Sequence, residues 1–210
     1  MSSSPTGRVI LVRHGESEGN ATRTFTPNTE VPLTERGRRQ ALRAAEIVAR
    51  DFQPVCIVAS PYTRARQTGE IIASALGVEL RIQGPFREQW IGDLRGQPYD
   101  SVLQDPSFDP KRRWEWRPSG GESLADVRGR VGPAFDSLAQ ANIGRDIVVV
   151  SHGGVMLALW AHVIGSWEQA RSSGNAAILC VEHDGRLFGE PRVVDAGDAG
   201  FDETKGETGG

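Results

Sequence analysis

The residues best suited to chemistry stand where an apolar run stops at a glycine. Val9-Ile10-Leu11-Val12 is followed by Arg13-His14-Gly15-Glu16, a pattern typical of a buried strand that ends in a turn. His14 would then project from the carboxyl end of the strand, where ligands bind in open α/β sheets. A neutral imidazole can attack phosphorus, and a guanidinium such as Arg13 holds phosphate oxygens through paired hydrogen bonds. The pair therefore indicates phosphate chemistry.

Two further apolar runs end in similar residues. Residues 55–59 lead into Ser60-Pro61, and Arg64 follows in the first turn of an expected helix. Residues 147–150 lead into Ser151-His152-Gly153. A helix N-terminus favours an anion, so a bound phosphate would explain a cation at this position. If the three strands are parallel neighbours, two arginines and two histidines meet at one edge of the sheet.

The helices and strands that are expected around these residues indicate a single α/β domain. The expected architecture is a three-layer α/β/α sandwich around a mostly parallel sheet with an antiparallel edge strand, and 210 residues suit a single domain. Helices are expected from Thr34 as N-cap to residue 50, from Pro61 to about residue 76, from Glu122-Ser123 onward, and over 155–164. Short strands are expected at 79–82 and, as edge strands, at 176–181 and 192–194.

The composition along the chain predicts the boundaries of this domain. Residues 1–7 are expected to be a flexible leader, 8–196 the domain, and 197–210 a disordered tail. Within the domain, residues 97–119 lack periodicity and are rich in Pro, Trp and basic side chains, which is typical of a lid-like insertion. Its tryptophans could anchor the insertion or contact a substrate, and both interpretations stay open.

Composition also excludes several functional classes. The net charge of −3 argues against nucleic-acid binding, and there is no 18-residue apolar run or signal peptide, so we expect a cytoplasmic protein without membrane contact. Cys56 and Cys180 lie within apolar runs and are expected to be small buried residues. His162 and His183 are too isolated to form a metal site, so no metal and no cofactor are expected. Whether the protein forms a homodimer stays open.

The combined motifs resemble those of the histidine phosphatase superfamily, the phosphoglycerate mutase-like proteins. They follow one another in the family's order from residue 8 to about 182 and are specific for the superfamily, but not for a substrate. The matching segments are Arg13-His14-Gly15-Glu16, Leu33-Thr34-Glu35-Arg36-Gly37, Ser60-Pro61 with Arg64-Ala65, Arg87-Glu88 with Gly92 and Gly96, Gly121-Glu122-Ser123, and Ser151-His152-Gly153-Gly154.

The resemblance implies a role for each matching residue. His14 would become phosphorylated, and Glu88 would protonate the leaving oxygen and then activate water. The implied catalytic residues are His14, Glu88, His152, Arg13 and Arg64, and the implied substrate-binding residues are Arg13, Asn20, Arg64, Glu88, His152 and Gly153. Asn20 could equally be a turn-forming residue, and Glu16 could be structural or contact the substrate.

Three functions remain open at this stage. The expected one is a metal-independent phosphatase that hydrolyses a small phosphomonoester through a phosphohistidine on His14. A non-catalytic phospholigand-binding relative is the least favoured, because both His14 and Glu88 are present. The third is a cofactor-dependent phosphoglycerate mutase, in which Lys111-Arg112-Arg113 would grip a second anionic group. Only 64 positions separate Glu88 from His152, fewer than the resemblance leads us to expect of a mutase, and Ile91 stands where the family's mutases tend to place Tyr.

Overall fold

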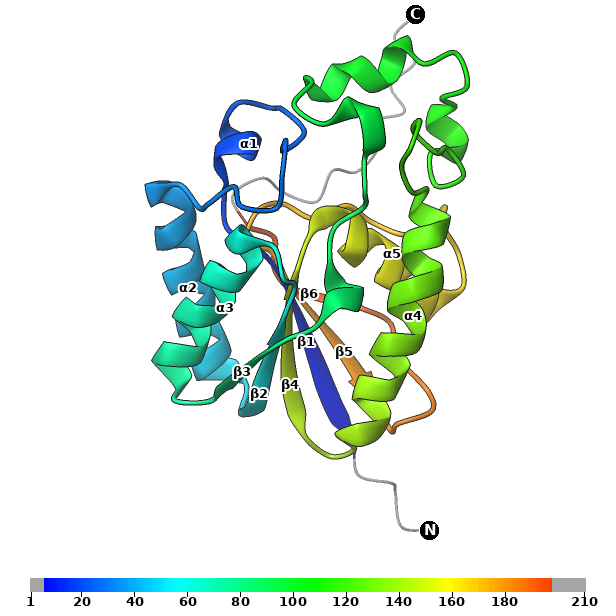
Figure 1. The fold of residues 1–210 in the computed structure, drawn as a ribbon. Coiled ribbons are helices and arrows are strands. Elements are labelled where there is room, and N and C mark those ends of the chain that lie inside the picture. Colours follow the sequence, from blue (N-terminus) through cyan, green and yellow to red (C-terminus); the bar gives the residue numbers. More distant parts are fainter. Residues whose placement is uncertain (1–5, 198–210) are drawn as a thin grey trace, which may run out of the picture.

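The structure is a computed structural model that describes residues 6–197. The expected tail therefore lies outside the described residues except for Gly197, and the expected leader except for residues 6 and 7. Strand β1 already begins at Gly7 (Figure 1). Among the described residues, none of the helices has both the length and the apolar content needed to span a bilayer.

Strands and helices alternate over most of the described chain. The strands are β1 (Gly7–Arg13), β2 (Pro54–Ala59), β3 (Glu79–Ile82), β4 (Asp146–Ser151), β5 (Ile178–His183) and β6 (Arg192–Asp195). The α-helices are α1 (Glu18–Ala21), α2 (Glu35–Asp51), α3 (Thr63–Leu76), α4 (Leu124–Ala141) and α5 (Gly153–Ile164). Short 3₁₀ helices are η1 (Gly84–Phe86), η2 (Gly92–Leu94), η3 (Tyr99–Gln104) and η4 (Pro110–Arg112).

The sheet has the order β3-β2-β4-β1-β5-β6, so the three strands that end in candidate residues are neighbours. Strands β1, β4, β2 and β3 are parallel, which brings their carboxyl ends to one edge, as predicted. The mostly parallel sandwich with an antiparallel edge strand is confirmed, because β6 lies at the edge and pairs antiparallel with β5. The expectation that residues 176–181 also form an edge strand is wrong. The antiparallel strand β5 pairs with β1 on one side and with β6 on the other, so it lies inside the sheet. A β-hairpin, β5–β6, supplies its outer neighbour.

Helices cover both faces of the sheet and form two apolar cores. Figure 1 shows α2 and α3 on one face and α4 and α5 on the other. Because side chains alternate along a strand, Ile10 and Val12 of β1 pack against α2 and α3, whereas Val9 and Leu11 pack in the core under α4 and α5. Cys56 and Cys180 are buried and free, as expected. Both cores fix the parallel strands that carry the site.

Two helix starts differ from the sequence prediction. Helix α3 begins at Thr63 instead of Pro61, because Ser60 Oγ accepts a hydrogen bond from the backbone N–H of Tyr62 and closes a turn before the helix. Helix α5 begins at Gly153, two residues earlier than expected. The N-cap of α2 agrees with the prediction, because the Thr34 side chain accepts from the N–H of Gly37.

The insertion at 97–119 contains η3 and η4. Both of its tryptophans contact other side chains of the protein. Trp114 stacks on Trp167 with the ring planes 1° apart and the centroids 6.0 Å apart. Trp116 is 9% exposed and donates its indole N–H to Asp105. These contacts favour the interpretation that the two tryptophans anchor the insertion.

Candidate active site

A cavity of about 390 Å³ opens at the carboxyl ends of the parallel strands. It brings together six of the seven site residues expected from the sequence. They are Arg13, His14, Asn20, Arg64, Glu88 and Gly153. The seventh, His152, is fully buried behind the cavity wall, and its ring meets the ring of His14 edge-on at 5.0 Å between centroids.

The hydrogen bonds of His14 define which ring nitrogen can act as a nucleophile. Nδ1 lies 2.6 Å from the carbonyl oxygen of Gly15. Because a carbonyl oxygen can only accept, Nδ1 carries the proton and Nε2 keeps its lone pair. The guanidinium of Arg64 donates from Nε to that Nε2 at 3.1 Å. The imidazole is therefore held in the tautomer that a nucleophile needs, with a cation beside the attacking atom.

The loop that carries His14 is locked by close contact with the start of α2. A Cβ at Gly37 would overlap the backbone carbonyl of Glu16, so only glycine allows this approach. The carboxylate of Glu16 accepts a hydrogen bond from Thr34 Oγ1 at 2.8 Å and pairs with Arg36. Of the two roles left open for Glu16, the structure favours the structural one.

Two guanidiniums, those of the buried Arg64 and the half-buried Arg13, flank His14. Arg13 donates from Nη1 to the carbonyl oxygen of Ser173, and Arg64 is 4% exposed. Among the described residues, neither Arg13 Nε nor Arg64 Nη1 has a hydrogen-bond partner, although both atoms are buried. Buried donors are nearly always paired in proteins. These two arginines therefore present free donors and positive charge where a bound anion would lie.

His152 adds a third buried polar atom to this group. Its Nε2 lies 2.7 Å from Ser60 Oγ, while its Nδ1 has no partner among residues 6–197. Ser60 Oγ accepts from the N–H of Tyr62, so its own hydrogen can be donated to Nε2. That arrangement leaves a proton on Nδ1, which makes His152 a third donor for an anion.

Both histidines are neutral at neutral pH. Burial, followed by the charges of Arg64 and Arg13, holds the pKa of His14 well below its ordinary value of 6.5. Burial and then the charge of Arg64 do the same to the pKa of His152. A nucleophilic histidine must be neutral, so this environment keeps His14 ready to react.

Glu88 also lines the cavity, and its carboxylate is held by backbone groups. Its Oε1 accepts from the backbone N–H of Gln89 at 2.8 Å, and its Oε2 accepts from the N–H of Gly154 at 3.3 Å. The second contact comes from the first turn of α5, two residues after His152. Helix α5 therefore helps to position both His152 and Glu88.

Replacing Gly154 with Ala is expected to impair catalysis without unfolding the protein. A Cβ at this position would lie 2.5 Å from Glu88 Oε1 and 3.3 Å from Leu124 Cδ2, and the flexible carboxylate would move away. We expect kcat/KM to fall about 10-fold to 100-fold because a displaced catalytic group loses its geometry. The thermal midpoint should stay within a few degrees. Ala at Gly129, where a Cβ meets nothing within 4 Å, is the matched control. Unchanged kinetics for Gly154→Ala would contradict the tight packing.

Asn20 joins a network that the sequence did not reveal. Its Oδ1 accepts from Asn175 Nδ2 at 3.0 Å, and its Nδ2 donates to the hydroxyl of Tyr99 at 3.1 Å. Asn175 also donates to the carbonyl oxygen of His14. Asn20 is therefore held at the cavity by residues from the insertion and from the segment before β5, rather than acting as a turn residue alone. No spacing in the sequence relates Asn175 to His14.

Several other cavity residues were not singled out from the sequence. The wall includes aromatic side chains and one further arginine, and only the bias of 86–99 toward aromatic and basic residues could have pointed to some of them. They are Phe25, Tyr62, Trp90, Tyr99 and Arg95. Among residues 6–197, no group of three or more His, Cys, Asp or Glu side chains is arranged to hold a metal ion.

Comparison with known proteins gives one family and several relatives. The family model of the histidine phosphatase superfamily (branch 1) matches residues 9–195. A glucosyl-3-phosphoglycerate phosphatase of Mycolicibacterium vanbaalenii is 32% identical over 201 residues and covers 88% of each chain. Phosphoglycerate mutase-like protein 4 of Arabidopsis thaliana is 33% identical over 158 residues, which are 72% of this chain and 69% of the relative.

A solved structure is similar over most of its length. It is the mycobacterial glucosyl-3-phosphoglycerate phosphatase in complex with VO3, with a TM-score of 0.78 and 27% identity. The alignment covers 89% of this chain and 97% of that one.

Proposed function

The chain belongs to the histidine phosphatase superfamily (branch 1), and from this premise we propose that it is a phosphatase that hydrolyses a small phosphomonoester through a phosphohistidine on His14. Membership of the superfamily was predicted from the motifs and is confirmed. The names of the relatives include both phosphatases and mutase-like proteins, and the first relative, matched over 88% of each chain, is a phosphatase.

One observation carries the proposal. Three buried polar atoms without a protein partner among the described residues belong to side chains around His14: Arg13 Nε, Arg64 Nη1 and His152 Nδ1. A phosphoryl group at His14 Nε2 would accept hydrogen bonds from these donors through its oxygens. The same cations and the neutral His152 donor would stabilise the charge that develops during transfer.

The reaction then proceeds in two balanced steps. In the first, His14 Nε2 forms a bond to phosphorus, the bond from phosphorus to the ester oxygen breaks, and Glu88 gives its proton to the departing alcohol. In the second, Glu88 takes a proton from water, the water oxygen attacks phosphorus, and the bond to His14 breaks to release phosphate. The two guanidiniums supply the positive charge that a metal ion supplies in other phosphoryl-transfer enzymes.

The cavity also indicates the kind of alcohol that leaves. Arg95 lies at the cavity wall with its guanidinium 4.5 Å from the ring centroid of Trp90, and its Nε donates to the carbonyl oxygen of Gly92. Within residues 6–197, no hydrogen bond or ion pair uses its two terminal nitrogens, so both can bind a ligand. We therefore propose a leaving group that carries a carboxylate. One member of this class is a phosphoglycerate ester, the kind of compound that appears in the name of the phosphatase relative.

Replacing Arg95 with Gln should change substrate preference more than chemistry. Without the guanidinium, we expect kcat/KM for a carboxylate-bearing phosphomonoester to fall about 10-fold to 100-fold, the usual loss for one charged hydrogen bond of 1.5–3 kcal/mol. The rate on 4-nitrophenyl phosphate should change less than about threefold in the same assay. Arg117→Gln, in the insertion and paired with Asp126 outside the cavity wall, is the control. Equal losses on both substrates would contradict a carboxylate site at Arg95.

The proposed function is tested by a panel of phosphomonoesters with and without a chelator. We expect release of inorganic phosphate at the same rate in both conditions, because the arginines replace a metal. Loss of activity on chelation, restored by a divalent ion, would contradict the mechanism. Mixing the enzyme with 3-phosphoglycerate and its bisphosphate primer tests the mutase alternative. Rapid formation of 2-phosphoglycerate with little free phosphate would overturn the phosphatase proposal.

A further inference from the structure

The segment that carries Glu88 has little regular structure of its own. We call residues 85–91 the acid loop; it includes the last two residues of η1 and ends at the residue before η2. In such a segment the backbone carbonyls have few partners within the loop, so other groups must satisfy them. The acid loop nevertheless holds Glu88 against Gly154 at the cavity.

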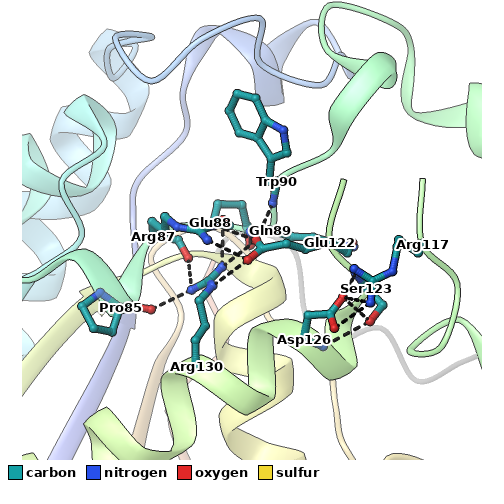
Figure 2. Close-up of polar contacts among 10 residues, drawn as sticks. All are labelled: Pro85, Arg87, Glu88, Gln89, Trp90, Arg117, Glu122, Ser123, Asp126 and Arg130. Carbon is teal, nitrogen blue, oxygen red and sulfur yellow. Dashed lines mark hydrogen bonds and ion pairs between the residues drawn. The ribbon is translucent and has the colours of Figure 1, made fainter. Parts of the chain in front are cut away.

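Arg130 of α4 satisfies three of the carbonyls in the acid loop, as Figure 2 shows in part. Its Nη1 donates to the carbonyl oxygens of Pro85 at 2.6 Å and Arg87 at 2.9 Å, and its Nη2 donates to that of Glu88 at 3.0 Å. The carbonyl between them, at Phe86, accepts from Ser151 Oγ at 2.7 Å. Four successive carbonyls up to the catalytic candidate are therefore bound by side chains of α4 and β4.

Glu122 holds the acid loop from its other side. Its carboxylate accepts two hydrogen bonds from Arg87 at 2.6 and 2.7 Å and one from the backbone N–H of Trp90 at 2.9 Å. Its own N–H donates to the carbonyl oxygen of Trp90, and its carbonyl oxygen accepts from Gln89 Nε2. The acid loop and Glu122, which lies two residues before helix α4, are thus joined through both backbone and side chains.

Glu122 and Arg130 also bind each other, so the two supports form one unit. Arg130 Nε and Nη2 each lie 3.1 Å from a carboxylate oxygen of Glu122, and the two side chains are 19% and 17% exposed. Burial raises the pKa of Glu122, but hydrogen bonds from Arg87 and Arg130 lower it to about 2. The carboxylate stays ionised across the working range of pH. Ser123, with Asp126 in a capping box, fixes the start of α4 beside it.

We propose that Arg130 and Glu122 are positioning residues for the general acid: together they hold the acid loop so that the Glu88 carboxylate reaches the leaving oxygen. This inference rests on the proposed role of Glu88. It gives a function to Gly121-Glu122-Ser123, a motif that has no role in binding phosphate here. Neither side chain lines the cavity, so both act through Glu88.

The test is the dependence of rate on the leaving group. We would measure kcat/KM, which reports the first phosphoryl transfer, for phenyl phosphate and 4-nitrophenyl phosphate. These esters are similar in shape, but phenolate needs protonation far more than nitrophenolate does. Glu88→Gln should lower the phenyl-to-nitrophenyl ratio about 100-fold. Arg130→Gln should lower it about 10-fold, because the acid is present but displaced.

Matched variants separate positioning from general damage. Arg117→Gln removes an arginine that pairs with Asp126 at the start of α4, without touching the acid loop, and should keep the wild-type ratio (Figure 2). Arg130→Lys keeps the charge but cannot bind three carbonyls and a carboxylate, so it should fall between the wild type and Arg130→Gln. If Arg130→Gln does not fold, Arg130→Lys and Glu122→Gln are judged by the same ratio.

The outcomes distinguish this inference from the proposed function. A normal ratio in Glu88→Gln would remove Glu88 as the acid and overturn the proposed mechanism with it. A lowered ratio in Glu88→Gln together with a normal ratio in the folded Arg130 and Glu122 variants would overturn only the positioning role. Lowered ratios in all of them, with Arg117→Gln unchanged, support it.

Discussion

His14→Ala is expected to abolish turnover, with kcat reduced by at least about 10⁴-fold. The variant removes the Nε2 lone pair that is proposed to attack phosphorus, while Arg13, Arg64 and His152 keep their places. Removing a covalent nucleophile typically costs several orders of magnitude even when the rest of a site is intact. The buried phosphate-binding donors should remain, so we expect the variant to bind inorganic phosphate and to be unable to transfer it.

The direct measurement is trapping of the intermediate. Mixing the wild type with a labelled phosphomonoester and quenching in alkali should yield a phosphohistidine at residue 14, whereas His14→Ala should yield none. His162→Ala is the control, since His162 bonds to Asp136 between α4 and α5, away from the cavity wall. Normal turnover by His14→Ala, or label on another residue, would rule out the covalent route.

Arg64→Ala is expected to lower kcat/KM by about 10²–10³-fold, the usual cost of losing one charge contact to a transition state. Arg64 is buried at the first turn of α3, beside the attacking nitrogen, so its loss removes both a donor and a nearby positive charge. Arg66→Ala is the control, because Arg66 lies in the same helix turn and pairs with the exposed Glu70. A loss of less than threefold would place the transferring group elsewhere.

Arg64→Ala should also move the acid limb of the pH profile of kcat/KM to higher pH. Burial is the main cause of the low pKa of His14, and the charge of Arg64 is the next. Removing Arg64 therefore raises the pKa of His14. Activity requires the neutral imidazole and is lost as pH falls through that pKa, so the acid limb of kcat/KM should move to higher pH in Arg64→Ala. Arg66→Ala should keep the wild-type profile.

The sequence alone predicted most of the residues that the structure brings together around His14, because strand ends carry their own signal. An apolar run that stops at Arg13-His14-Gly15 or Ser151-His152-Gly153 indicates both a buried strand and a polar turn, and parallel strands deliver such turns to one edge. The sequence could not predict that β5 lies inside the sheet. The periodicity of a strand indicates which side chains are buried, but it does not indicate which strands pair with it. The pairing of β5 with β1 joins segments from opposite ends of the described chain.

Local patterns also could not predict the residues that hold the site together. Asn175 is 161 positions from His14 and Arg130 is 42 from Glu88, and they meet only after the sheet and helices are packed. Arg130 stands on the helix α4, where an arginine on a solvated face is expected, and only the tertiary fold places its guanidinium under the carbonyls of the acid loop. Residue type and local spacing therefore determined the chemistry of this protein. Packing decided its geometry, because hydrogen bonds between distant segments depend on positions that no local spacing encodes.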